Sequence, residues 1–133
     1  VTSKTALRKQ YHFRPSPGGG FHAWDIHRLI DLAAGLPVLE VPLSQITELN
    51  ENWWFQTEDA VPTPAAMIEH FRLMRDADLS YPIILCGEGR LMDGMHRAMK
   101  ALSEGHQSIR AHRFDETPSP DHANVMPGEL DYT

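Results

Sequence analysis

A run of five residues, Asp93-Gly94-Met95-His96-Arg97, brings together groups that bind phosphate. It stands directly before a helical pattern, so Gly94 is expected at the N-terminus of a helix. The free backbone N–H groups and the positive end of the helix dipole favour an anion at that position. His96 and Arg97 add side chains that can carry positive charge, which the dipole disfavours unless an anion binds between them. The run therefore predicts a phosphate-binding site made by Gly94, Met95, His96 and Arg97.

Two interpretations of Asp93 remain open. Its carboxylate could orient His96 or hold a divalent cation, or it could cap the helix, which stabilises a helix start by about 1 kcal/mol. The cation would be Mg²⁺ arriving with a nucleotide, because Mg²⁺ keeps most of its waters and needs few carboxylates. A metal site made by the protein alone is not predicted, since the eight histidines show no His-x3-His spacing.

Strands and helices are both expected around this run. An apolar strand at 81–86 turns at 87–89 and returns through 90–92 into the motif. The helix that follows is expected to bury Met95, Ala98, Met99 and Leu102, which fall at i, i+3, i+4 and i+7. A last strand is expected at 108–114, where apolar and polar residues alternate.

Upstream, further helices are expected at 25–34, at 44–49 and from Thr63 to near Asp78, with a short strand at 38–41. The first of these helices carries Ile26, Leu29, Ile30 and Ala33 on one face, and the third carries Ala66, Met67, Phe71 and Met74. The predicted class is α+β, a small mixed β-sheet with packed helices.

Both ends of the chain look irregular. Residues 1–23 form a basic arm in which Pro15, Pro17 and the glycines 18–20 argue against a helix or a central strand. Residues 115–133 are an acidic, proline-containing tail without periodicity. A single domain is therefore expected at 24–114.

Composition limits the partners. The net charge of −6 argues against DNA binding, which relies on clustered Lys and Arg. No stretch reaches the roughly 18 apolar residues of a membrane span, so no membrane partner is expected. The single cysteine, Cys86, suits a reducing, cytoplasmic setting.

Aromatic residues form a second candidate feature. Trp53, Trp54 and Phe55 are consecutive in a polar loop, so at least one ring is expected to stack on a ligand or to lie in a subunit interface. The ordinary alternative is two buried rings and one on the surface. Trp24 near the glycine run belongs to the same aromatic set, and Arg14 is a candidate clamp for phosphate or carboxylate.

Residues 81–114, with the strand near 38–43, resemble the ParB/sulfiredoxin superfamily. The matching parts are the strand, glycine turn, returning strand into Asp-Gly-x-His-Arg, helix and closing strand. Met95 stands where sulfiredoxins have their nucleophilic cysteine, and a thioether cannot form a thiolate, so that activity is not expected. A chromosome-partitioning role is not expected either, because the chain has no helix-turn-helix segment.

Within the superfamily, the ADP-dependent free-serine kinases are the most similar functional group. The resemblance implies that Asp93, Gly94, His96 and Arg97 cradle phosphate, and that Glu48 or Glu51 acts as a base. We therefore expect a nucleotide- or phosphate-binding protein, with a phosphotransferase or nucleotide hydrolase among its possible activities. The alternatives are a non-catalytic ligand-sensing or protein-interaction module, including a homodimer, and a ParB-like nuclease.

Overall fold

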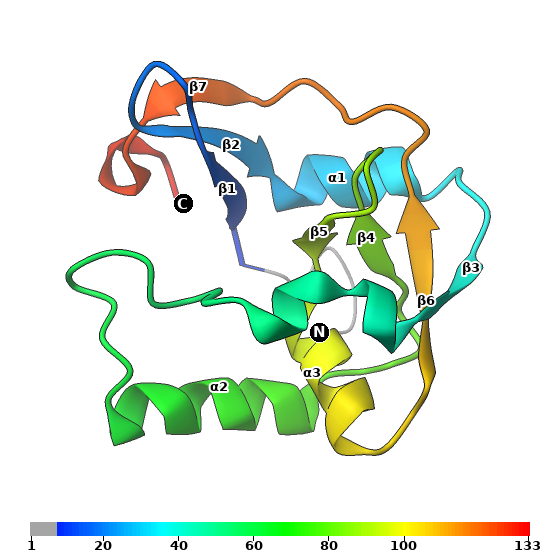
Figure 1. Ribbon diagram of the computed structural model, residues 1–133. Helices are drawn as coiled ribbons and strands as arrows, with labels where there is room; N and C mark the ends of the chain where they lie inside the picture. The colour runs from blue at the N-terminus through cyan, green and yellow to red at the C-terminus, as the bar shows by residue number, and fades with distance from the viewer. Residues whose placement is uncertain (1–7) are drawn as a thin grey trace.

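Residues 8–133 are described by a computed structural model, which has an α+β fold with two β-sheets (Figure 1). In chain order the elements are β1 (Tyr11–Pro15), β2 (Phe21–Asp25), α1 (Ile26–Ala33), β3 (Leu39–Pro42), the 3₁₀ turns η2 (Leu43–Gln45) and η3 (Thr47–Asn50), α2 (Pro64–Asp76), β4 (Ile83–Leu85), β5 (Leu91–Asp93), α3 (Met95–Ser103), β6 (Ser108–Arg113), β7 (His122–Val125) and η4 (Pro127–Glu129). The predicted α+β class is confirmed.

The central sheet has the strand order β3-β6-β4-β5. Strands β4 and β6 are parallel, and the other pairs are antiparallel. All three residues of β4 are buried, because both faces of the sheet are covered. Ile83 and Leu85 belong to a core with α3, η2 and η3, whereas Ile84 belongs to a core with α1. The sheet is thus the middle layer between α1 and α3.

The two covering helices follow local sequence signals, with one difference. Helix α1 begins after Asp25, whose side chain accepts a hydrogen bond from the His27 N–H, and it buries Ile26, Leu29 and Ala33 as predicted. Helix α3 buries Met95, Ala98 and Ala101, while Leu102 is exposed. The expectation that Leu102 faces the core is wrong, because the small side chains of Ala98 and Ala101 let the helix approach the sheet closely.

A second sheet, β1-β2-β7, replaces the predicted irregular ends. The expectation of an irregular arm is wrong for residues 11–23, because Pro15 closes β1 and the glycines make the turn. Gly20 has φ +65, and a Cβ there would lie 2.9 Å from the Val125 carbonyl oxygen, so the tail packs tightly on this turn. The expectation of an irregular tail is likewise wrong at β7. The part of the predicted arm at residues 1–7 lies outside the described residues.

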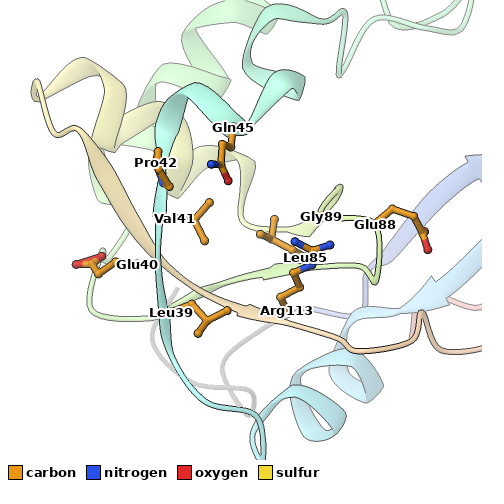
Figure 2. Close-up of a pocket in the computed structure, with 9 residues that line it drawn as sticks. All are labelled: Leu39, Glu40, Val41, Pro42, Gln45, Leu85, Glu88, Gly89 and Arg113. Atoms are coloured by element: carbon orange, nitrogen blue, oxygen red, sulfur yellow. The ribbon is translucent and has the colours of Figure 1, made fainter.

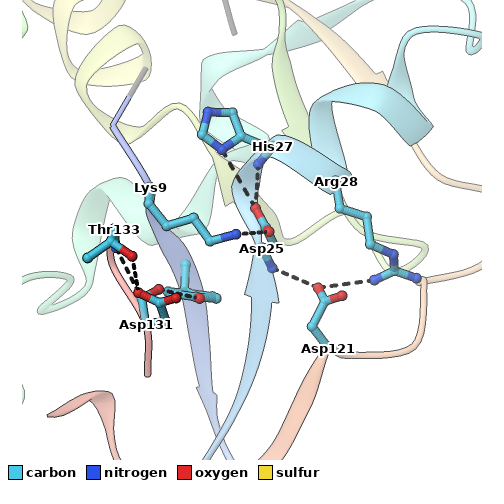
Figure 3. Close-up of polar contacts among 8 residues, drawn as sticks. Lys9, Asp25, His27, Arg28, Asp121, Asp131 and Thr133 are labelled. Carbon is cyan, nitrogen blue, oxygen red and sulfur yellow. Dashed lines mark hydrogen bonds and ion pairs between the residues drawn. The ribbon is translucent and has the colours of Figure 1, made fainter. Parts of the chain in front are cut away.

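Polar contacts attach the C-terminal segment to this sheet and to α1 (Figure 3). Asp121 accepts a hydrogen bond from the Asp25 N–H at 2.8 Å, and the Arg28 guanidinium lies 3.3 Å from the same carboxylate oxygen. Asp25 in turn pairs with Lys9 at 2.6 Å. Lys9 near the start of the described chain and Asp121 in the acidic tail therefore both attach to Asp25, where β2 ends and α1 begins.

Helix α2 is the most weakly packed element. Thr63 caps it and Pro64 begins it, as predicted, but it buries none of its residues and lies at the margin of the molecule, against α3 and the loop that carries Trp54 (Figure 1). The predicted core face is wrong in part, since Met67 and Phe71 are more than 40% exposed. The side toward α3 instead includes His70. No helix in residues 8–133 has the length and hydrophobicity to cross a membrane.

Candidate functional site

Gly94 stands at the N-terminus of α3, as predicted. Its φ is +115, a left-handed conformation that side chains disfavour. A Cβ at this position would lie 2.5 Å from the Ile83 Cγ2, so only glycine fits. No side chain caps the helix start, and the first backbone bond within the helix runs from the Ala98 N–H to the Gly94 carbonyl. The N–H groups of the first turn are therefore left for a ligand or solvent.

Arg97 lies directly over this helix start. Its Nη2 would be 3.1 Å from a Cβ on Gly94, and it donates to the Asp93 Oδ2 at 2.9 Å. Its Nη1 donates to the carbonyl oxygens of Tyr81 and Pro82 at 3.0 and 2.7 Å. Asp93 thus orients Arg97, a role that differs from both interpretations drawn from the sequence. The guanidinium keeps two N–H groups without a hydrogen bond to residues 8–133.

His96 is paired with a histidine from α2. The His96 Nε2 lies 2.9 Å from the His70 Nδ1, and the rings are 19° from parallel, so they meet edge to edge. The indole of Trp54 covers both rings, with centroid distances of 3.7 Å to His70 and 4.8 Å to His96. From the sequence, Trp54 was a candidate for stacking on a ligand or lying in an interface. One face of its ring is instead occupied by the imidazoles of His70 and His96.

The histidine pair is neutral at neutral pH. Burial, the neighbouring His70 and the Arg97 guanidinium together lower the pKa of His96 to about 4. Burial also lowers the pKa of His70. The site therefore carries one cation, Arg97, where the sequence suggested two, and His96 can act only as a neutral donor or acceptor.

The two candidate bases, Glu48 and Glu51, are held by one arginine. Glu48 on η3 is 1% exposed, and its Oε2 accepts from the Leu91 N–H at 2.8 Å and lies 3.2 Å from the Arg90 Nε. Its Oε1 is buried without a hydrogen-bond partner. Glu51 is exposed, and both of its oxygens accept from Arg90, at 3.0 and 2.8 Å. Only Glu48 therefore has an oxygen without a partner.

The remaining candidates form a separate cluster around the β1–β2 hairpin. Arg14 donates from Nε to the His12 Nε2 at 2.9 Å, and its guanidinium lies over the ring of Trp24. The imidazole of His12 stacks on Trp53 at 5.9 Å. Burial first, and then Arg14 and Arg90, lower the pKa of His12 to about 3. Within the described chain, Arg14 therefore contacts His12 and Trp24, and no interaction joins it to the helix start of α3.

The structure thus brings Asp93, Gly94, His96 and Arg97 together and adds Trp54 and His70. Sequence reasoning missed His70. It lies four residues after Ala66 and four before Met74, so the helical spacing already placed it on that face. The apolar pattern drew attention to Met67 and Phe71 instead.

Among residues 8–133 no three His, Cys, Asp or Glu side chains gather closely enough to hold a metal ion. Asp93 is the one carboxylate at the helix start among the sequence candidates, and its Oδ1 makes no hydrogen bond to the described residues. This oxygen is the group that could contact a nucleotide-borne Mg²⁺. In comparisons with known proteins, no family model, no curated protein and no solved structure matches the chain.

Proposed function

We propose that the N-terminus of α3 binds the phosphate of a nucleotide or of a phosphorylated small molecule. The observation that carries this proposal is the uncapped start of α3 at Gly94, with the Arg97 guanidinium lying over it. First-turn N–H groups and a fixed guanidinium are donors that suit a phosphate oxygen. Since Arg97 is already held by Asp93 and two carbonyl groups, it loses little conformational entropy when it binds.

His96 would contribute a neutral hydrogen bond. The deprotonated oxygens of a phosphate accept hydrogen bonds and cannot donate them, so binding through such an oxygen selects the tautomer in which the His96 Nδ1 carries the proton. The His96 Nε2 then accepts from the His70 Nδ1, which matches their 2.9 Å separation. In this way His70 acts through His96 and fixes its ring.

For catalysis we propose phosphoryl transfer or nucleotide hydrolysis with Glu48 as the base, because its Oε1 lacks a partner. Turn η3, which carries Glu48, packs against α3. Because this carboxylate is buried, a substrate would reach it only after η3 or the loop at residues 51–62 moves. Glu51 is the weaker candidate, since Arg90 engages both of its oxygens.

The resemblance to the ParB/sulfiredoxin superfamily supports this proposal at the level of element order. The succession β4, β5, α3 and β6, with Gly94 at the start of α3, follows the pattern quoted for the family. We propose that the fold belongs to this superfamily and that the free-serine kinase group within it is the nearest functional comparison.

Isothermal titration with ATP, ADP, CTP and inorganic phosphate, each with Mg²⁺, tests binding. We expect at least one ligand to bind, and His96→Ala to weaken it about tenfold, the loss expected for one hydrogen bond to a charged group. His106→Ala, a change at an exposed histidine of the loop after α3, is the matched control. Absence of binding by all ligands would refute the proposal. If the Glu48→Gln variant still releases phosphate, Glu48 is not the base, and only the binding part of the proposal stands.

A second candidate function is association of two copies through α2. Met67, Ile68 and Phe71 are exposed on one flank of α2 and Leu73 on the other, with Val61 nearby in sequence and Leu102 on α3, each 41–54% exposed. Such a concentration of exposed apolar side chains is typical of an interface. Light scattering on the intact chain tests this, with Phe71→Asp as the disrupting variant and Glu69→Lys on the same helix as the control. A monomer at all concentrations would exclude the homodimer.

A further inference from the structure

A pocket of about 450 Å³ lies beside the edge strand β3, between that strand and the β4–β5 turn (Figure 2). Gly94 packs on Ile83 at the beginning of β4, whereas the pocket includes Leu85 at the end of β4 and Gly89 in the next turn. The two places are therefore separated by the length of that strand. The volume is within the range of pockets that bind small molecules, about 300–1,000 Å³.

The pocket is bordered by segments from separate parts of the chain. Strands β4 and β6 are parallel, with Leu85 paired to Arg113 at their carboxyl ends, and the pocket extends from these residues along β3 to Pro42 and Gln45. Turn η2 and the β4–β5 turn form its walls, through Gln45 and Gly89.

The floor of the pocket is partly apolar. Leu39 and Val41 of β3 supply its accessible apolar surface, Leu85 of β4 is only 2% exposed, and Pro42 borders it. Leu39 is 42% exposed, so the end of the pocket formed by β3 is open to solvent. An aliphatic group lying on this floor would cover apolar surface that is now in water.

Only one of the three charged residues around the pocket directs its charge inward (Figure 2). Glu40 alternates with Leu39 and Val41 along β3, so it faces the other side of the sheet, where its carboxylate lies 3.5 Å from the Ser108 hydroxyl. Glu88 turns toward the opposite face as well, where it accepts from the Thr117 hydroxyl at 3.3 Å. The charge presented to the pocket is therefore that of Arg113.

The guanidinium of Arg113 is fixed in place but still has donors. Its Nη2 donates to the Gly87 carbonyl at 2.8 Å, and its Cζ would lie 3.5 Å from a Cβ on Gly89. Among residues 8–133 no carboxylate pairs with it. In Figure 2 the Gln45 amide points into the same space from η2. An arginine and an amide above an apolar floor match a molecule with a carboxylate at one end and a hydrocarbon group at the other.

We propose that this pocket binds a small aliphatic carboxylate, with its carboxylate on Arg113 and its hydrocarbon group on Leu39 and Val41. The site is independent of the phosphate site proposed at α3. It requires no metal and no chemical step.

Amide chemical-shift mapping by NMR tests the proposal, with 3-methylbutanoate as the probe and 3-methylbutanamide as its uncharged match. We expect the carboxylate to shift the amide signals of Leu39, Val41 and Gly89, and the amide compound to bind at least about tenfold more weakly. Arg113→Gln should reduce carboxylate binding by a similar factor. Arg110→Gln on the same strand is the control, because the Arg110 guanidinium donates to the Ser80 carbonyl oxygen and does not line the pocket.

Leu39→Trp provides a second variant that keeps Arg113 and fills the open end of the pocket. It should abolish binding while the remaining amide signals stay in place, which separates loss of the pocket from loss of the fold. The proposal is overturned if the carboxylate shifts no pocket signal, if both probes bind equally, or if folded Arg113→Gln binds as the unmodified chain does.

Discussion

The Nδ1 of His70 and the Nε2 of His96 lie 2.9 Å apart and join α2 to the first turn of α3. Helix α2 buries no residue of its own, so this hydrogen bond and the overlying Trp54 ring are a large part of its attachment. The Lys100 ammonium adds contacts to the carbonyl oxygens of Arg75 and Ala77 at 2.9 and 2.7 Å. The position of α2 and the protonation of His96 are therefore linked.

His70→Ala should raise the pKa of His96. Burial is the main reason that this pKa falls to about 4, and His70 is the next. Removing the His70 ring reduces both effects, so the pKa should move from about 4 toward the ordinary value of 6.5. Titration of the His96 ring protons by NMR measures this, with His106→Ala as the control. An unchanged His96 pKa in His70→Ala would contradict the pairing.

The elements that depend on local signals were predictable from sequence. Thr63 with Pro64 begins α2, Asp25 caps α1 and Gly94 begins α3, because caps and left-handed glycines act on the adjacent backbone. The β1–β2 hairpin was missed because Pro15 and the glycines 18–20 were taken to interrupt regular secondary structure. In the fold, Pro15 ends a strand and the glycines form the turn.

The contacts at the candidate site were less predictable because they join distant parts of the chain. His70 and His96 are 26 residues apart, and their pairing depends on how α2 docks on α3. The neutral state of His96 follows from that docking, so the sequence alone suggested a cation. The run 93–97 still located the helix start correctly.

Gly94→Ala should destabilise the protein more than Gly105→Ala does. Both glycines have a positive φ, +115 and +79, so both variants strain the backbone by about 1–2 kcal/mol. Only at Gly94 would the new methyl group clash, 2.5 Å from the Ile83 Cγ2, while a Cβ on Gly105 would meet nothing within 4 Å. The clash should add about 1–3 kcal/mol to the loss. Urea unfolding of both variants measures the difference, and equal losses would contradict the close contact.

Glu48→Gln should cost more stability than Glu51→Gln. Glu48 is 1% exposed and accepts from the Leu91 N–H beside Arg90, so neutralising it weakens charge-assisted bonds in a buried place, at a cost of about 1–3 kcal/mol. Glu51 is exposed, and its surface ion pair with Arg90 contributes little because solvent screens it. Urea unfolding at neutral pH compares the two variants. Equal losses, or a larger loss in Glu51→Gln, would contradict this prediction.

Acid should destabilise the protein as the pH falls from about 6.5 to about 3, in part through His12. Burial, Arg14 and Arg90 hold the pKa of His12 at about 3, below the 6.5 of the unfolded chain. Between these values the unfolded chain binds a proton that the folded chain does not, so the unfolding free energy decreases as the pH falls. The difference between these two pKa values corresponds to at most about 5 kcal/mol.

Urea unfolding across this pH range measures the effect, with His12→Gln as the test variant, because its side-chain carbonyl can still accept from the Arg14 Nε. That variant should lose part of the pH dependence while its stability at neutral pH changes less. His106→Gln, at an exposed position, should keep the full dependence. If the unfolding free energy of His12→Gln still depends on pH as strongly as that of the unmodified chain, the buried His12 imidazole is not the source of this dependence. His96, whose pKa of about 4 acts in the same direction, is then the residue to substitute next.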